Sequence, residues 1–358
     1  MRKVIALFTV VVGFFGILGC SPKDAKVTSS YEAQTRVYYI AAEKVMWDFA
    51  PSGKAEAPWS KRTKYQKVRY IEYTDDSYST KKEQPVWLGI LGPIIRGVEG
   101  DTLKIVFMNK ADKPYSMHPH GLLYTKNSEG ADHTAHHSEM DMNGEGAKVL
   151  PGERYTYTWQ VTDKSAPGPD EGGSKVWMYH SHVDSVQDIY DGLVGPIIIT
   201  SAEHAKVDGT PDDVDKEFVS MFFIFDESKE GMSDEVAEIH KKHAINGTIF
   251  DNLKGITMDK GDKVRWHLLG MGNEVDIHSA HWHGEVVSYQ HQYTDVIELL
   301  PASMKSVDMV AENVGTWMFH CHVADHIKAG MTMEYQILDP ASSAKDSMGM
   351  ESGHADAM

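Results

Sequence analysis

The sequence predicts an all-β protein built from two tandem β-sandwich domains, and three observations support this prediction. Apolar and polar residues alternate in short, aromatic-rich runs that Pro, Gly and Asp clusters separate, which is the pattern of strands in a β-sandwich. Helical periodicity is scarce. Similar motifs also recur in the same order in both halves of the 358-residue chain, which indicates an internal repeat. A chain of this length is sufficient for two domains of about 150 residues each.

The clearest strand candidates lie in the first half of the chain. Residues 37–40, 68–71 and 103–107 alternate between apolar and polar side chains and are rich in aromatic or β-branched types, so we expect a strand at each. Residues 233–242 are the one segment that we expect to form a short helix, because Asp234 and Glu235 would lie in its first turn.

The repeat sets the expected domain boundaries. Two pairs of histidine motifs and two pairs of turns correspond between the halves: Gly100-Asp101 with Gly261-Asp262, His118-Pro119-His120-Gly121 with His281-Trp282-His283-Gly284, Pro151-Gly152-Glu153 with Pro301-Ala302-Ser303, and Trp177-Met178-Tyr179-His180-Ser181-His182 with Trp317-Met318-Phe319-His320-Cys321-His322. Each repeat is long enough for one β-sandwich. We therefore expect domain one at 34–200, a polar linker at 201–215 and domain two at 216–339.

The N-terminus is expected to be a lipoprotein signal peptide over residues 1–20. A positively charged start precedes an apolar run at 4–18, as in export signals. The residues Ile17-Leu18-Gly19-Cys20 resemble a bacterial lipobox, after which Cys20 would become the lipidated first residue. The serine that follows favours a periplasm-facing position on the outer membrane. The alternative is an ordinary signal peptide with a chance cysteine.

The segments outside the two domains predict a soluble body tethered by lipid. Residues 21–33 are polar and are expected to form a flexible spacer, and residues 340–358 are expected to form a flexible tail. No stretch beyond the signal approaches the ~20 apolar residues of a membrane span.

The charge and the cysteine count restrict the possible functions. The net charge is −17, which argues against nucleic acid as a partner because such binding depends on basic patches. It suits a protein that attracts cations. The chain has two cysteines, so if Cys20 carries lipid, Cys321 is the single thiol. A free thiol is a liability in an oxidising compartment, unless it is buried in the core or bound to a metal.

The surroundings of Cys321 favour a metal. Cys321, His326 and Met331 form a Cys-x4-His-x4-Met motif, and a thiolate, an imidazole and a weak axial thioether are the ligands of a mononuclear blue-copper site. The first repeat lacks this set, because Tyr115, Ser181 and Leu193 stand where the second repeat has His278, Cys321 and Met331.

Eight further candidate ligands occur as four His-x-His pairs. Side chains two residues apart lie on the same face of a strand, and imidazole is a good copper ligand. A zinc centre usually takes only about four ligands, so eight histidines predict several metals. Scattered surface histidines would not explain why the first repeat keeps these pairs and loses the mononuclear set. The pairs are His118/His120, His180/His182, His281/His283 and His320/His322.

These motifs resemble those of multicopper oxidases. Nearly the whole chain after the spacer is similar to the C-terminal domain pair of the ceruloplasmin and hephaestin family. The similar stretches include Tyr38-Tyr39-Ile40-Ala41-Ala42, Leu88-Gly89-Ile90-Leu91-Gly92-Pro93, His243-Ala244-Ile245-Asn246-Gly247 and Gly270-Met271-Gly272-Asn273-Glu274-Val275-Asp276. The resemblance implies two tandem cupredoxin-like Greek-key barrels, with no mononuclear copper in domain one.

The resemblance also implies the ligands of four coppers per chain. The type 1 copper would take His278, Cys321, His326 and Met331. The type 2 copper would take His118 and His281, and the two type 3 coppers would take His120, His180, His182, His283, His320 and His322. Electrons from a small reductant would pass through Cys321 to the three-copper cluster, which would reduce dioxygen to water. The family precedent for two domains is a homotrimeric ring with each cluster between chains.

The same resemblance identifies a candidate site for ferrous iron beside the type 1 copper. Glu238, His243 and Asp325 match three of its ligands, and Glu274 matches the fourth, which a neighbouring chain would supply in a trimer. Carboxylate oxygens stabilise the ferric product. This match favours a ferroxidase, although each acidic residue taken singly is usually a solvated loop residue.

Four other functions are alternatives to a ferroxidase. A laccase-like oxidase of phenols or aromatic amines needs no iron site. A cuprous oxidase of copper tolerance would use soft thioethers, and His/Met-rich segments occur, although such segments are more often simply disordered. A copper nitrite reductase is inconsistent with Ser181 and the histidine count, and a non-enzymatic cupredoxin carrier leaves the His-x-His pairs without a role. The His/Met residues are His133, His136, His137, Met140, Met142, Met348, Met350, His354 and Met358.

Overall fold

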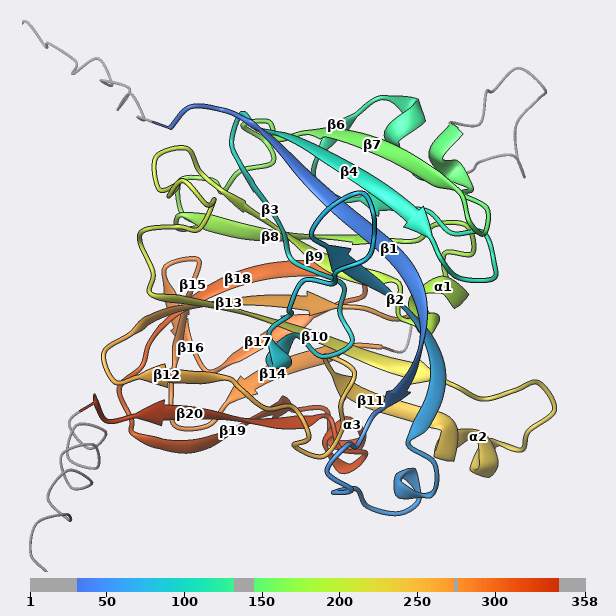
Figure 1. Ribbon diagram of the computed structural model, residues 1–358. Coiled ribbons are helices and arrows are strands. Elements are labelled where there is room, and N and C mark those ends of the chain that lie inside the picture. The colour runs from blue at the N-terminus through green and yellow to red at the C-terminus, as the bar shows by residue number, and fades with distance from the viewer. Residues whose placement is uncertain (1–30, 132–144, 274–275, 341–358) are drawn as a thin grey trace, which may run out of the picture.

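The computed structural model of the chain describes residues 31–131, 145–273 and 276–340 (Figure 1). The predicted signal peptide with Cys20, the His/Met residues of 133–142, Glu274 and the Met/His residues of the tail lie outside the described residues. In the described part, no helix is long and apolar enough to cross a membrane.

The first half of the chain forms a sandwich of two sheets around one core. Alternating side chains of both sheets fill this core, including Ile105, Tyr157 and Ile197. One sheet has the order β2 (Lys64–Tyr73), β1 (Thr35–Asp48), β4 (Thr102–Asn109), β7 (Arg154–Gln160) and β6 (Leu123–Tyr124), and the other has the order β3 (Ile95–Val98), β9 (Val194–Thr200), β8 (Ser174–His180) and β5 (His118–Pro119).

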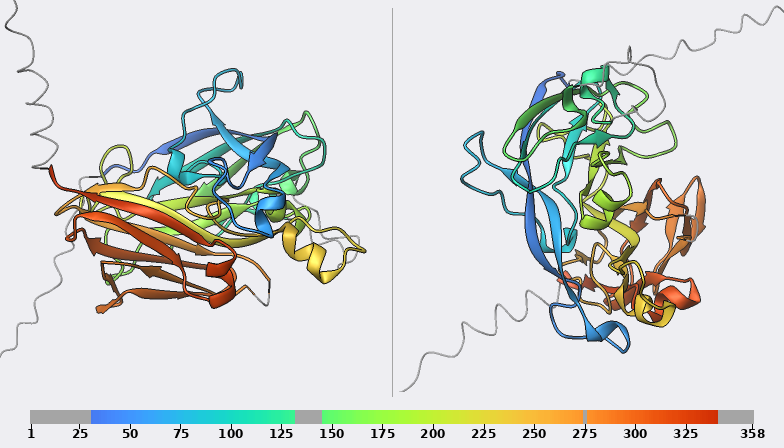
Figure 2. Two further views of the ribbon diagram at one scale, coloured as in Figure 1. Left: turned by 90° about the horizontal axis from the view of Figure 1, so that it is seen from below. Right: turned by 90° about the vertical axis from the view of Figure 1, so that its right-hand side faces the viewer.

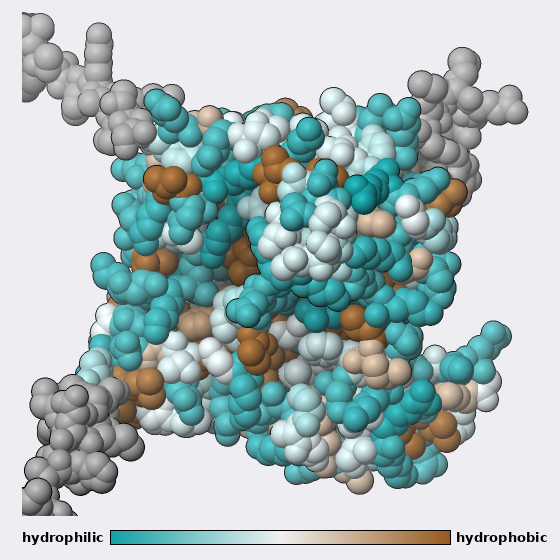
Figure 3. All heavy atoms as spheres, in the orientation of Figure 1, coloured by the Kyte–Doolittle hydropathy of each residue, from teal (hydrophilic) through white to brown (hydrophobic). Residues whose placement is uncertain are grey.

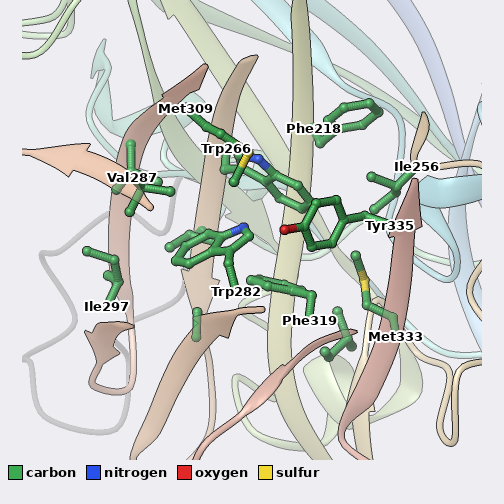
Figure 4. Close-up of a cluster of buried hydrophobic side chains, with 14 of the residues drawn as sticks. Phe218, Ile256, Trp266, Trp282, Val287, Ile297, Met309, Phe319, Met333 and Tyr335 are labelled. Atoms are coloured by element: carbon green, nitrogen blue, oxygen red, sulfur yellow. The ribbon is translucent and has the colours of Figure 1, made fainter. Parts of the chain in front are cut away.

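The second half forms a second sandwich. Figure 4 shows its core, where Trp266, Trp282, Phe319 and Tyr335 lie between the sheets. One sheet has the order β11 (Lys241–Ile245), β10 (Lys216–Asp226), β13 (Lys263–Gly270), β18 (Ser303–Val310), β15 (Val287–Tyr289) and β16 (Gln292–Thr294), and the other has the order β12 (Thr257–Asp259), β20 (Thr332–Leu338), β19 (Gly315–Cys321), β14 (His278–Trp282) and β17 (Val296–Leu299).

The pairing of the strands confirms the all-β prediction and the internal repeat. β1 pairs in parallel with β4 as β10 does with β13. β3 pairs in parallel with β9 as β12 does with β20. The three segments expected to be strands lie within β1, β2 and β4. The two sandwiches are therefore copies of one topology.

The predicted helix is confirmed, but other helices were not predicted. α2 (Asp234–His240) begins after Ser233, whose side chain accepts the N–H of Val236 as a cap. α1 (Gln187–Asp191) and α3 (Ala324–Lys328) are too short to give a periodic pattern. The described residues also contain the 3-10 turns η1 (Trp59–Lys61), η2 (Val86–Leu88), η3 (Lys126–Ser128) and η4 (Glu145–Ala147).

The two sandwiches pack on each other through a third apolar core. Val176, Met178 and Ile198 of β8 and β9 face Val219 and Met221 of β10 in this core. The four sheets therefore stack as four layers, in the order β1 sheet, β3 sheet, β10 sheet and β12 sheet (Figure 2). Hydrophilic side chains cover most of the face shown in Figure 3, with apolar residues only in small groups.

Asn246 joins the sandwiches by hydrogen bonds. Its Nδ2 donates to the carbonyls of Trp87 at 2.9 Å and Val219 at 2.7 Å, and its Oδ1 accepts the N–H of Met221 at 2.7 Å. Its backbone φ of +49° is one that asparagine tolerates better than most residues.

Replacing Asn246 should destabilise the whole fold. We expect Asn246→Ala to lower the free energy of unfolding by about 1–3 kcal/mol, because buried groups lose their hydrogen-bond partners. Urea denaturation measures this change. As a control, the exposed Asn127→Ala should stay within about 0.5 kcal/mol of the unmodified protein. Equal stability of the two variants would contradict this role of Asn246.

Candidate metal centres

The four residues expected to bind the mononuclear copper lie in one buried region. Cys321 ends β19, His278 begins β14 and His326 lies on α3. The Cys321 Sγ lies 3.5 Å from His326 Nδ1 and 3.9 Å from His278 Nδ1. Met331 is buried in the same core, and its carbonyl accepts the Cys321 N–H at 3.0 Å. A thiol with two imidazoles and a thioether fits copper.

Burial sets the protonation of this group. It lowers the pKa of His278 to about 4 and also lowers the pKa of His326. Burial raises the pKa of the Cys321 thiol. The imidazoles are therefore neutral and able to bind a metal at neutral pH, and the thiol ionises when a cation compensates its charge.

In the second sandwich, four histidine rings lie close together, and ligand nitrogens of His281, His283 and His320 lie within 4.8 Å of one another. The strand register places His281 directly opposite His320, and the ring of His281 lies 4.9–5.2 Å from the rings of His283, His320 and His322. The Nδ1 of His320 donates to the Cys321 carbonyl at 2.8 Å, so its Nε2 carries no proton in the neutral ring. That Nε2 lies 3.0 Å from the Nε2 of His283, a separation suited to two ligands of one metal.

The first sandwich repeats this arrangement. His118 lies opposite His180 in the register, and the ring of His118 lies 5.2–5.5 Å from the rings of His120, His180 and His182. The Nε2 atoms of His120 and His180 are 3.1 Å apart. The Nδ1 of His180 bonds to the Ser181 carbonyl at 2.9 Å. Each sandwich thus carries one cluster of four histidines.

Backbone carbonyls also orient the two histidines expected to bind the type 2 copper. His118 Nδ1 lies 2.7 Å from the Glu129 carbonyl, and His281 Nδ1 lies 2.9 Å from the Asp295 carbonyl. Such partners fix the tautomer, in which Nε2 carries no proton and is the nitrogen that binds a metal. The carbonyl partners could not be predicted, because they come from loops without a motif.

The two clusters are separate within one chain. Among the described residues, the ring contacts join the eight histidines into two groups of four without a contact between the groups. β5 and β8 belong to the second layer, whereas β14 and β19 belong to the fourth. Since packed sheets lie about 10 Å apart, roughly 20 Å separates these layers.

In the first sandwich, a hydrogen-bonded network lies at the position that corresponds to the candidate mononuclear site. Ser181 Oγ donates to Asp188 Oδ2 at 2.6 Å and accepts the Ser116 N–H at 3.1 Å. Tyr115 is buried nearby in the core, and Asp188 is 4% exposed. The sequence predicts the loss of the copper ligands. It does not predict the role of Asp188, because the motif that follows Cys321 in the second repeat has no counterpart of this residue.

The candidate iron residues line a cleft of about 690 Å³ next to the mononuclear site. Glu238 lies on α2, His243 on β11 and Asp325 on α3, beside His326. The rings of His243 and His326 are 5.2 Å apart. Burial, and to a smaller extent His326, lowers the pKa of His243 to about 3. The buried His243 Nδ1 has no hydrogen-bond partner among the described atoms, which is consistent with a nitrogen that binds a cation.

Further residues line the cleft that the sequence does not predict. Asp226 and Asp276 add carboxylates, Lys241 forms an ion pair with Glu238 at 3.4 Å, and Trp59 and Tyr190 come from the first sandwich. No sequence signal identifies Trp59 or Tyr190, because they are distant in the chain from the copper motif.

Comparisons with known proteins agree with this geometry. Two family models described as multicopper oxidase match residues 67–204 and 226–341. Hephaestin of Mus musculus is 36% identical over 368 residues, which cover 90% of this chain and 30% of hephaestin. Ceruloplasmin of Homo sapiens is 35% identical over 356 residues, which cover 87% of this chain and 31% of ceruloplasmin. The chain thus spans about a third of the length of these relatives.

Solved structures show the same fold. One, titled as the crystal structure of a multicopper oxidase, has a TM-score of 0.60 and 21% identity, covering 85% of this chain and 89% of that chain. The blue copper oxidase from Nitrosomonas europaea has a TM-score of 0.55 and 20% identity, covering 86% of each chain. At this identity the likeness concerns the fold alone, and it supports two tandem cupredoxin-like barrels.

Cys321 should be essential for the mononuclear centre and dispensable for the fold. We expect Cys321→Ser to abolish the intense blue absorption of the copper-loaded protein, because that absorption needs a thiolate ligand. Its far-ultraviolet circular dichroism should stay unchanged. The matched variant Ser181→Cys should add no second blue centre, because Tyr115 and Leu193 supply no ligand. A blue Cys321→Ser variant would refute the assignment.

Proposed function

The chain belongs to the multicopper oxidase family, and we propose that it is a ferroxidase. In this reaction, four ferrous ions each lose one electron, and one dioxygen with four protons becomes two waters. The observation that carries the proposal is the cleft next to His326, which Glu238, His243 and Asp325 line, together with the buried His243 Nδ1 that has no hydrogen-bond partner among the described atoms. Two carboxylates and an imidazole suit a ferrous ion, and the carboxylates favour the ferric product.

Each residue has a defined part in this proposal. Copper, when bound by the mononuclear set and the eight histidines, supplies the one-electron steps and the reduction of dioxygen. His243 and Asp325 hold iron beside the copper ligand His326, which keeps the electron's path short. The hydrogen bond of 2.8 Å from His320 Nδ1 to the Cys321 carbonyl then connects the mononuclear site to the histidine cluster. We propose four coppers per chain, with the type 1, 2 and 3 ligands expected from the sequence.

One observation favours a second candidate, a laccase-like activity. The cleft of about 690 Å³ lies within the range of about 300–1,000 Å³ that holds small organic molecules. A phenol or an aromatic amine therefore fits the space. The cuprous-oxidase alternative depends on His/Met segments that lie outside the described residues, so it stays a prediction.

We propose that the active form is a homotrimeric ring with each copper cluster between chains. The two groups of four histidines in one chain lie in separate layers. A copper cluster with eight histidine ligands therefore needs one group from each of two chains. Exposed apolar residues follow both clusters in the sequence, including Val186 at 64% and Val286 at 52% exposure. A head-to-tail contact of this kind closes into a ring. Glu274 lies outside the described residues and stays the predicted fourth iron ligand, supplied by a neighbouring chain.

The cellular location is also part of the proposal. We propose export by the signal at residues 1–20 and a lipid anchor on Cys20 at the periplasmic side of the outer membrane. Residues 34–200 and 216–339 would be the two domains, joined by residues 201–215. The chemistry of a metal oxidase that uses dioxygen is compatible with this compartment.

Replacing Glu238 should affect ferrous iron selectively. We expect Glu238→Ala to lower kcat/KM for ferrous iron by roughly tenfold or more, since a bond to a charged group contributes about 1.5–3 kcal/mol. Oxidation of a bulky aromatic amine should change little. Glu235→Ala, an exposed acid on the same helix, is the matched control. An equal loss on both substrates would overturn the iron site and favour the laccase-like activity.

Assembly and copper content test the ring. We expect sedimentation to show three chains per particle and elemental analysis to show about four coppers per chain. Val286→Glu should lower both values, because a charge would enter the proposed contact, whereas Val207→Glu, at a residue 87% exposed, should change neither. A monomer that holds four coppers and consumes dioxygen would rule out the shared cluster.

A further inference from the structure

We propose that Trp59 is a positioning residue that holds His243 in place at the iron cleft. Trp59 lies on residues 49–63, which connect β1 to β2 and which we call the arm. The inference rests on the proposed function, because it takes Glu238, His243 and Asp325 as the ferrous site. It adds that the first sandwich forms part of the reductant site of the second.

The arm reaches across the joint between the sandwiches. In Figures 1 and 2 it lies beside α2 and α3, far from the rest of the first sandwich. Ser52 Oγ donates to Asn252 Oδ1 at 2.7 Å, and Asn252 Nδ2 donates to the Lys54 carbonyl at 2.8 Å. The Ile249 N–H donates to the Phe49 carbonyl at 2.9 Å. These bonds fix the arm on the second sandwich.

Trp59 packs against the imidazole that lines the cleft. Its indole ring is edge-on to His243, with ring centres 6.5 Å apart and an interplanar angle of 80°. His326 is a second ring neighbour of His243, at 5.2 Å. Trp59 is 7% exposed and lines the cleft itself. The His243 ring is thus held between Trp59 of the first sandwich and the candidate copper ligand His326 of the second.

The backbone of Trp59 holds the same strand. Lys242, next to His243 on β11, is fully buried, and its Nζ donates to the Trp59 carbonyl at 3.0 Å and to the Ile239 carbonyl at 2.6 Å. A buried ammonium is costly without such partners. The arm therefore contacts two consecutive residues of β11, one through the indole ring and one through a carbonyl.

The contact to His243 depends on shape and not on a polar bond. The Trp59 Nε1 is buried without a hydrogen-bond partner among the described atoms, so another aromatic ring should replace the indole. Without an aromatic ring, His243 loses packing on one side and can rotate from the cleft. Glu238 and Asp325 alone would then bind the cation, and more weakly. Cys321 makes no contact with Trp59 in the described hydrogen bonds and ring contacts, so the blue centre should remain.

The test uses the copper-loaded full chain and cobalt(II), which stands in for ferrous iron without being oxidised by the enzyme. We expect calorimetry to show that Trp59→Ala binds cobalt(II) roughly five- to tenfold more weakly, the effect of losing one aromatic contact. KM for ferrous iron should rise by the same factor with little change in kcat. Trp59→Phe should restore most of the binding, and Ser60→Ala, at an exposed residue next to Trp59 on the arm, should behave as the unmodified protein.

The outcomes separate this inference from the function it rests on. Unchanged cobalt(II) binding and KM in Trp59→Ala, with intact blue absorption, would overturn the role of Trp59 alone. Equal weakening in Ser60→Ala would overturn it too, because the effect would then not depend on the indole ring. If the unmodified protein binds no cobalt(II) and Glu238→Ala oxidises ferrous iron normally, the proposed function fails as well. If Trp59→Ala does not fold, Trp59→Leu gives the same decision.

Discussion

The alternation of side chains along β19 is the constraint on which the rest of the structure depends. Cys321 points into the core of the second sandwich, where His278, His326 and Met331 surround it. His320, one residue earlier, points to the opposite face and joins the histidine cluster. The hydrogen bond from its Nδ1 to the Cys321 carbonyl spans the strand at 2.8 Å. Two candidate metal centres are thereby connected through one peptide unit, because neighbouring side chains of a strand point to opposite faces.

The two sandwiches have the same topology but differ in the residues at the candidate metal sites. The first replaced its mononuclear ligands with the Ser181–Asp188 hydrogen bond and kept its four histidines. Its arm also extends over the second sandwich, so that Trp59 packs against His243. The first sandwich thus contributes a side chain to the cleft beside the candidate copper site of the second. The apolar core between the sandwiches makes this contribution possible, because it fixes their relative position.

Much of this arrangement could be predicted from the sequence, because copper ligands follow strand alternation and short loops. The Cys-x4-His-x4-Met spacing, the His-x-His pairs and the helix at 234–240 are local patterns. In the structure, Cys321 and His326 lie together with His278, and His281 and His283 lie together with His320. The second histidine of each pair lies just beyond the end of its strand, which a periodic pattern cannot define. Trp59 and Asp188 were missed for another reason. Trp59 acts through a contact between segments distant in the chain. Asp188 is the partner of Ser181, which stands where the second repeat has a copper ligand. Neither kind of role leaves a sequence motif.

A whole sheet separates the two histidine clusters of one chain, and we propose that one chain completes the copper cluster of its neighbour. Mixing two inactive variants tests this claim most directly. His118→Ala/His120→Ala disables the cluster of the first sandwich, and His281→Ala/His283→Ala disables that of the second. The two proteins are dissociated, mixed, reassembled and loaded with copper, and dioxygen uptake with ferrous iron is measured. A mixed ring contains one contact at which both clusters are intact, so we expect activity to return on mixing. A mixture that assembles and binds copper but consumes no more dioxygen than either variant alone would contradict it.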